Sequence, residues 1–116
     1  MLEVLLITSS DGDRWGVPKG LVEPDMTPAE SAANEAWEEA GVRGRVSRAA
    51  VGRFEYSKWG GKCDVEVFTM HVEEVLDEWP ESAVRRRKWL PVGDAAERAS
   101  LEELAELIEE LPRFVA

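Results

Sequence analysis

The sequence contains few of the nucleophilic and metal-binding side chains that many enzymes use. It has one cysteine, Cys63, and one histidine, His71. A single cysteine excludes an internal disulfide and fits a reducing cytoplasm, and its place in an apolar run favours a core thiol over a nucleophile. His71 falls late in an expected strand, where a structural or surface residue is commoner than a ligand. Neither residue is a leading candidate for a functional site.

Long apolar runs and surplus positive charge are also missing. No apolar run approaches the ~18 residues of a membrane helix, and no signal peptide, repeat or linker is apparent. Lys and Arg number 14 against 24 Asp and Glu, which gives a net charge of −10. That balance argues against binding a nucleic acid polymer or an anionic membrane. Any polyanionic ligand would therefore have to be bound by a local group of positive charges.

The residues that are present favour one globular domain. A chain of 116 residues with 44% apolar content can bury a core of its own. Apolar and β-branched runs predict strands over residues 2–8, 63–72 and 85–92, with a hairpin turn at 58–62. Residues 42–56 form a long segment of β character that is broken by Gly44 and Gly52. Ser100 and Glu103 predict a capping box for a last helix that runs to Leu111 and is ended by Pro112.

The most informative stretch is the predicted helix after Thr27. Thr27 is a good N-cap, Pro28 suits the first helical position, and Glu30 completes a capping box. Gly41 supplies the stop. An apolar stripe with helical spacing comprises Ala29, Ala32, Ala33, Ala36, Trp37 and Ala40.

The opposite side of this helix carries Glu35, Glu38 and Glu39. Two of them lie in the last turn, where the helix dipole disfavours negative charge, and Glu35 and Glu39 repel each other as an i, i+4 pair. A divalent cation such as Mg²⁺ would favour this arrangement. The alternative is a solvated acidic face, because the last predicted helix repeats the pattern at Glu102, Glu106, Glu109 and Glu110.

The stretch from Gly20 to Val42 resembles the signature of the Nudix hydrolases, Gly-x5-Glu-x7-Arg-Glu-U-x-Glu-Glu-x-Gly-U, in which U is apolar. Met26 stands where the family has Glu, and Asn34 where it has Arg. In the family these two residues form an ion pair, so their joint replacement indicates a different brace between loop and helix. The matching positions are Gly20, Glu35, Ala36, Glu38, Glu39, Gly41 and Val42.

The resemblance implies a fold and a mechanism. The expected fold is α/β (α+β), a Nudix-type α/β/α sandwich with a mixed sheet between helices, formed by a single domain over residues 1–116. Met1 would enter almost directly on the family's second strand, so the usual first strand is expected to be absent. Glu35, Glu39 and the Gly20 carbonyl would bind Mg²⁺, with Mn²⁺ as an alternative. Glu38 would be the general base or bind a further metal.

Further segments are similar to the diphosphoinositol polyphosphate phosphohydrolase branch, which also cleaves dinucleoside polyphosphates. These segments are Arg53 to Glu55, Val75 to Trp79, and the basic run ending at Trp89, although Lys88 stands where that branch is expected to have Glu. The resemblance implies hydrolysis of a phosphoanhydride in one of these substrates. Two alternatives are another nucleoside diphosphate-linked substrate and a catalytically silent, nucleotide-binding Nudix domain. The sequence leaves a homodimer open.

Phosphates that extend beyond the metal need cationic donors. Strand alternation directs Arg85 and Arg87 to one face and Arg86 and Lys88 to the other, unless the run is simply a charged edge strand. Weaker candidates are Trp15 and Trp59 as ligand contacts, and Glu55 and Glu81 as extra carboxylates. The predicted substrate-binding residues are Arg14, Lys19, Arg53, Arg85 and Arg87.

Overall fold

The computed structural model of the chain describes residues 2–58 and 60–115. Its helices are α1 (Pro28–Glu35), continued by a π-helical turn η1 (Ala36–Ala40), α2 (Val92–Arg98), α3 (Glu102–Glu110) and a 3-10 turn η2 (Leu111–Arg113). Its strands are β1 (Glu3–Thr8), β2 (Trp15–Gly16), β3 (Val42–Val46), β4 (Gly52–Lys58), β5 (Gly61–Val67), β6 (Met70–Val75) and β7 (Arg87–Pro91).

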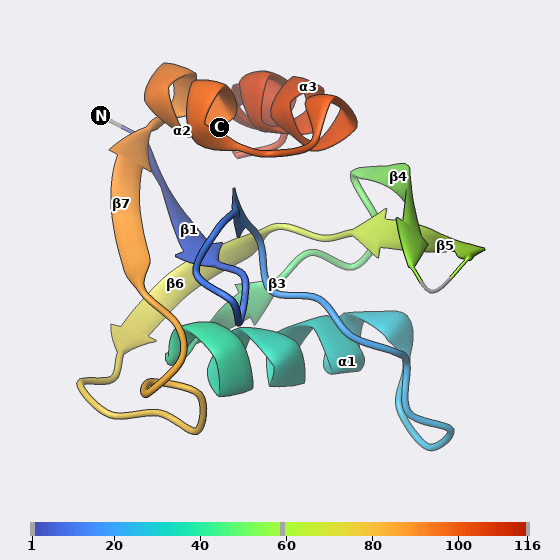
Figure 1. Cartoon of the computed structure of the whole chain (residues 1–116), viewed down its shortest axis with the longest axis vertical. Coiled ribbons are helices and arrows are strands. Elements are labelled where there is room, and N and C mark those ends of the chain that lie inside the picture. The colour runs from blue at the N-terminus through green and yellow to red at the C-terminus, as the bar shows by residue number, and fades with distance from the viewer. Residues whose placement is uncertain (1, 59, 116) are drawn as a thin grey trace.

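The helices lie on two sides of the strands. Figure 1 shows α2 and α3 on one side and α1 on the other, with β1 and β7 running between them. This arrangement confirms the predicted α/β/α layering. Within the described residues, no helix combines the length and apolar character needed to cross a membrane.

The strands form three small sheets instead of the single mixed sheet expected. The sheets have the orders β2-β1-β7, β3-β6 and β4-β5, and every pairing recorded between described strands is antiparallel. The strand predicted over residues 63–72 is two strands, because the chain leaves β4 at Val67 and pairs with β3 from Met70. The reversal of apolar phase along this stretch therefore marks a change of partner strand.

Strand β1 separates two hydrophobic clusters. Leu6 and Ile7 are both buried, and as neighbours on a strand they point to opposite faces. Leu6 packs with the α2 and α3 side, and Ile7 packs with η1 and β3. Burial of each side chain contributes roughly 1.5–3 kcal/mol. The run at residues 2–8 is thus a doubly covered strand, as its composition predicts.

The capping box expected at Ser100 is wrong. The Ser100 hydroxyl accepts a hydrogen bond from the Trp15 N–H at 3.2 Å and donates one to the Trp15 carbonyl at 3.1 Å. Because that hydroxyl is used to hold β2, α3 begins at Glu102 with Leu101 at its N-cap and no side-chain cap. Pro112 lies within η2, after α3 has ended.

The β4–β5 hairpin has the predicted turn, with Lys58 opposite Gly61 and Gly60 at a φ of 76°. Cys63 is half-buried on β5, and His71 is exposed on β6. Trp59 and Met1 lie outside the described residues, so the suggested ligand contact of Trp59 and the entry of the chain at Met1 have no structural counterpart here.

Candidate metal and phosphate site

The sequence signals at the start of α1 act as predicted. The Thr27 hydroxyl accepts a hydrogen bond from the Glu30 N–H at 3.1 Å, and the Glu30 carboxylate accepts one from the Thr27 N–H at 2.8 Å. These bonds also hold the pKa of Glu30 below its usual value. The helix therefore starts at Pro28. Because the start of a helix sets the direction of every later side chain, it also decides which glutamates face the preceding loop.

The other end of this helix departs from a regular α-helix. Residues Ala36–Ala40 form a π-helical turn, and Gly41 ends it in the left-handed region with a φ of 66°. The guanidinium of Arg87 donates to the Ala40 carbonyl at 2.8 Å and to the Leu76 carbonyl at 2.6 Å. It also lies 4.0 Å from the centre of the Trp79 ring. Carbonyls left unpaired at the helix end are thus bound by a distant arginine, which no local pattern could predict.

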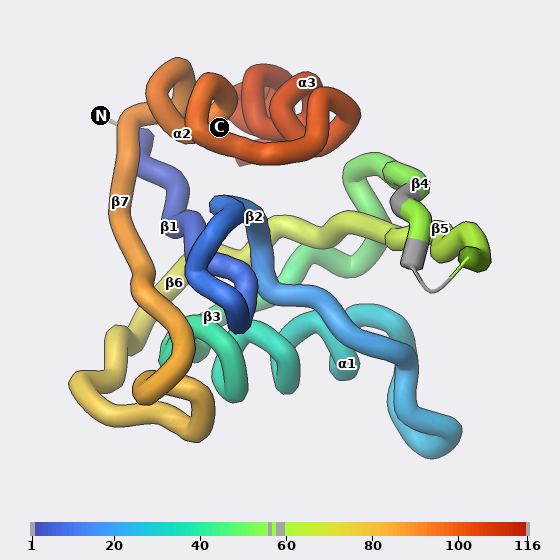
Figure 2. Tube along the Cα trace, viewed as in Figure 1, coloured from blue at the N-terminus to red at the C-terminus, as the bar shows by residue number. Residues whose placement is uncertain are grey.

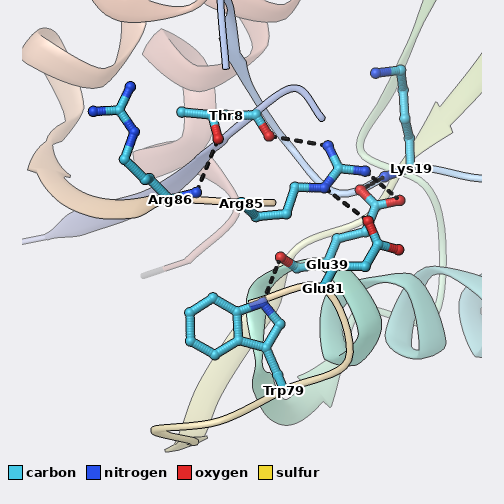
Figure 3. A network of polar contacts seen from close by, with 7 residues as sticks. All are labelled: Thr8, Lys19, Glu39, Trp79, Glu81, Arg85 and Arg86. Carbon is cyan, nitrogen blue, oxygen red and sulfur yellow. Dashed lines mark hydrogen bonds and ion pairs between the residues drawn. The ribbon is translucent and has the colours of Figure 1, made fainter. Parts of the chain in front are cut away.

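Glu39 is the buried carboxylate of the site, with 6% of its surface exposed. It accepts a hydrogen bond from the Lys19 N–H at 3.3 Å and lies 3.5 Å from Nη2 of Arg85. Figure 3 shows these groups together, with the Lys19 side chain running away from the carboxylates. Burial raises the pKa of Glu39, and the positive charge of Arg85 opposes that rise.

Glu35 lies directly against Gly20. The space where a Cβ of residue 20 would stand is occupied by the Glu35 carboxylate, so any larger residue there would displace that carboxylate. Burial is the largest cause that raises the pKa of Glu35, and together with the nearby charge of Glu39 and a hydrogen bond between the two side chains it brings that pKa to about 7. The predicted proximity of Gly20, Glu35 and Glu39 is present, and this cluster strongly favours a cation or a proton.

Two more carboxylates adjoin this pair. Glu38 accepts a hydrogen bond from the Asn34 amide at 3.2 Å, and its carbonyl accepts one from the Glu81 N–H at 3.0 Å. The Glu81 carboxylate lies 2.9 Å from Nε of Arg85, and its charge contributes to the raised pKa of both Glu35 and Glu39. Glu81 was only a weak candidate from sequence, because it comes from the segment between β6 and β7. Figure 2 shows that segment folding back beside the end of α1.

The donor set suits Mg²⁺ that keeps water and phosphate ligands. No three His, Cys, Asp or Glu side chains in the described part of the chain converge as a complete metal cage. Mg²⁺ is usually bound through one or two carboxylates plus substrate phosphates, so a cage is not required. Glu35 and Glu39, with the Gly20 backbone beside them, could hold such an ion.

The predicted cationic residues separate into two groups. Arg85 and Arg87 face η1, whereas Arg86 faces Trp15, 5.7 Å from its ring centre, so the predicted alternation is present. Figure 3 shows the side chains of Arg85 and Arg86 pointing to opposite sides. Trp15 itself packs against the core.

The remaining predicted cations lie elsewhere on the surface. Arg14 is exposed in the loop before β2. Arg53 is exposed on β4, 3.9 Å from Glu66, and β4 lies away from η1 in Figure 1. On the same hairpin Glu55 lies 3.6 Å from Lys62. None of these three side chains is recorded in contact with the carboxylate cluster.

Comparison with known proteins agrees with the fold. A family model described as the NUDIX domain matches residues 2–111. The chain belongs to the Nudix domain family.

Its relatives include "Nudix hydrolase 16, mitochondrial" of Arabidopsis thaliana, with 39% identity over 84% of this chain and 58% of the relative. Another is "Diphosphoinositol polyphosphate phosphohydrolase 3-alpha" of Homo sapiens, with 42% identity over 80% of this chain and 57% of the relative. The chain thus spans about three fifths of the length of these curated relatives.

The fold is also similar to a solved structure, described as a crystal structure of C. elegans Ap4A hydrolase. The TM-score is 0.77, with 98% of this chain and 86% of that chain covered. At 24% identity this likeness shows the fold alone.

Proposed function

We propose that the chain hydrolyses a phosphoanhydride bond in a diphosphoinositol polyphosphate or a dinucleoside polyphosphate, with Mg²⁺ as cofactor and Mn²⁺ as an alternative. The observation that carries this proposal is the carboxylate pair Glu35 and Glu39, packed against Gly20 in a place where neither folding nor the helix dipole favours negative charge. The name of the human relative, a diphosphoinositol polyphosphate phosphohydrolase, supports this substrate class, and the name of the Arabidopsis relative, a Nudix hydrolase, supports hydrolysis in general.

The residues then have separate roles. Glu35, Glu39 and the Gly20 carbonyl would hold the metal, which when bound offsets the charge of the diphosphate. Glu38 orients a water and accepts its proton as the water oxygen bonds to phosphorus and the bridging P–O bond breaks. Lys19, Arg14 and Arg53 are proposed to bind phosphates outside this centre. For Arg87, the bonds to main-chain carbonyls support a role in shaping the helix end instead.

A substrate panel tests the proposal. Purified protein with Mg²⁺ is incubated with diphosphoinositol polyphosphates, dinucleoside polyphosphates, nucleoside triphosphates and nucleotide sugars in ¹⁸O-water, and the labelled products identify the bond that breaks. We expect turnover of a member of the first two classes, and a loss of about 10²–10⁴-fold in kcat for Glu38→Gln. Glu109→Gln, an exposed glutamate on α3, is the matched control and should keep full activity.

The main alternative is a silent Nudix domain that binds a nucleotide without cleaving it. It is motivated by Met26 and Asn34, which line an open cavity of about 480 Å³ together with Trp37. Against it, Asn34 still hydrogen-bonds to Glu38. Absence of turnover across the whole panel, with binding retained, would favour the silent domain. If only a nucleotide sugar or a nucleoside triphosphate is cleaved, the proposed substrate class is wrong but the proposed reaction, hydrolysis of a phosphoanhydride, still holds.

We further propose a small-molecule substrate in the cytoplasm, with no nucleic acid polymer or membrane as partner. The net charge of −10 supports the first part, and the single cysteine supports a reducing compartment. Cell fractionation of the tagged chain tests the location.

A further inference from the structure

Arg85 has more partners than an ordinary surface arginine. Its Nε lies 2.9 Å from Glu81, its Nη2 lies 3.5 Å from Glu39, and its Nη1 donates to the Thr8 carbonyl at 3.0 Å. Only 15% of its side chain is exposed. The planar guanidinium therefore directs donors in three directions at once, and its position is fixed by protein groups.

The partners come from three parts of the fold. Thr8 ends β1, Glu39 lies in η1, and Glu81 belongs to the same connection as Arg85. Two hydrogen bonds to main-chain carbonyls of η1 also hold that connection in place. Trp79 Nε1 donates to the Glu39 carbonyl at 3.0 Å, and the Glu81 N–H donates to the Glu38 carbonyl. Figure 3 shows Arg85 at the centre of this network. Arg85 thus joins the end of the helix to the loop at the level of their side chains.

The charges do not balance within this network. Arg85 supplies one positive charge beside the carboxylates of Glu39 and Glu81, with Glu35 adjoining Glu39. A structural ion pair would be complete with one carboxylate. Here the arginine holds two carboxylates near a third, which leaves an excess of negative charge that a dication would neutralise.

We propose that Arg85 is a positioning residue that holds the Glu39 and Glu81 carboxylates side by side at the metal site and does not bind substrate directly. The inference rests on the proposed function, because it assigns Arg85 a role towards the same metal. It replaces the sequence-based prediction of Arg85 as a phosphate contact. It also brings Glu81 into the site as a carboxylate that no signature position contains.

The test compares Arg85→Lys, Arg85→Met and Glu81→Gln. Lysine keeps the positive charge but loses the planar fork that reaches Glu39, Glu81 and Thr8 together. Mg²⁺ affinity is measured by isothermal titration calorimetry without substrate. The values of kcat and KM are measured with the best substrate of the panel. Folding is checked by circular dichroism and thermal melting. Arg45→Met is the matched control, because Arg45 forms an exposed ion pair with Glu73 at 3.3 Å.

We expect each of the three variants to bind Mg²⁺ about 10–100-fold more weakly, as is usual when a group that orients metal ligands is removed. The kcat should fall while the KM for substrate stays near that of the wild type. Glu81→Gln combined with Arg85→Lys should lose no more affinity than Arg85→Lys alone, since the two act as one unit. Arg45→Met should match the wild type in all measurements.

Other outcomes overturn the inference. Folded Arg85→Lys with wild-type Mg²⁺ affinity would make Arg85 purely structural, and a raised KM at unchanged kcat and Mg²⁺ affinity would make it a substrate contact. If Arg85→Met does not fold, Arg85→Lys and Glu81→Gln carry the test. If the wild type binds no Mg²⁺, the proposed function fails and this inference with it. Wild-type binding and turnover with an unaffected Arg85→Lys would refute the inference alone.

Discussion

The close approach of Gly20 to Glu35 gives a prediction at the scale of single residues. An added Cβ at residue 20 would meet the Glu35 carboxylate, which can swing away because it is the end of a flexible side chain. We therefore expect Gly20→Ala to change the melting temperature little but to weaken Mg²⁺ binding at least ~10-fold, because the displaced carboxylate is a proposed ligand. Calorimetric titration measures this effect.

Gly16→Ala is the control for that experiment, because a Cβ at Gly16 meets nothing within 4 Å. It should leave Mg²⁺ affinity unchanged. Equal affinity for both alanine variants would argue against Glu35 as a ligand, whereas equal loss would indicate a general effect on the loop.

Arg87 gives a second residue-scale prediction, on stability. Its guanidinium bonds to the Ala40 and Leu76 carbonyls and stacks on Trp79. Arg87→Met should therefore lower the free energy of unfolding by about 2–3 kcal/mol, since hydrogen bonds to charged groups are among the stronger ones. Urea denaturation measures the loss. The exposed Arg48 supplies the control, and an Arg87→Met variant no less stable than Arg48→Met would refute this role.

Local sequence identified the carboxylates of the site but not the partners that hold them. Helical spacing placed Glu35 and Glu39 on one side of the predicted helix, and the Nudix resemblance gave Gly20 its place beside them. Alternation grouped Arg85 with Arg87, although the strand predicted over residues 85–92 begins only at Arg87. Their acceptors are side chains and carbonyls on other segments, such as Glu39 and Leu76, and periodicity along one strand contains no information about those neighbours.

At the scale of elements, the contact between α1 and the loop that follows Gly20 can be tested by introducing the ion pair that the family has at positions 26 and 34. Met26 and Asn34 line the same open cavity, at the positions where the family has an ion pair. Met26→Glu alone should lower stability by about 0.5–1 kcal/mol, because it leaves an unpaired charge in a half-buried place. Asn34→Arg alone should lower it less, because the Glu38 carboxylate lies within reach of the new charge. The double variant should recover about 1 kcal/mol through a new ion pair.

Urea denaturation of the four proteins in this double-mutant cycle gives the coupling energy. Strict additivity would show that the loop and helix are not close enough at these positions to form the pair. Restored stability with reduced kcat would show that Asn34 is needed for its hydrogen bond to Glu38.

Most elements could be predicted from sequence, and the exceptions have a common cause. Thr27, Glu30 and Gly41 mark the helix correctly because caps and stops act within one turn of the chain. The last carbonyl of the π-helical turn and the Ser100 hydroxyl are both bound by tertiary partners, Arg87 and Trp15 respectively. Contacts of this kind override local propensity.

At the scale of the whole molecule, the carboxylate pair predicts how stability depends on pH. The pKa of Glu35 is raised from 4.5 to about 7. Between these values the folded metal-free protein holds more protons than the unfolded chain, so stability from this source is present at low pH and is lost as the pH rises to about 7. Mg²⁺ should reverse the loss, because it replaces the proton.

Thermal melting at about pH 5, 7 and 8, with EDTA or with Mg²⁺, measures this dependence. We expect the stabilisation by Mg²⁺ to be largest at the highest pH, and Glu35→Gln to flatten the metal-free profile across this range. A wild-type profile with the same slope as Glu35→Gln would contradict the assignment.

The path of the chain through this site also affects how the protein can be divided. Gly20, Glu35, Glu38 and Glu39 precede the β4–β5 hairpin, whereas Glu81 and Arg85 follow it, and the tip at Gly60 and Gly61 is exposed. A cut at that tip would yield two fragments that each carry part of the constellation. The proposed hydrolase activity would then report their reassembly, which makes this chain a starting point for a split reporter.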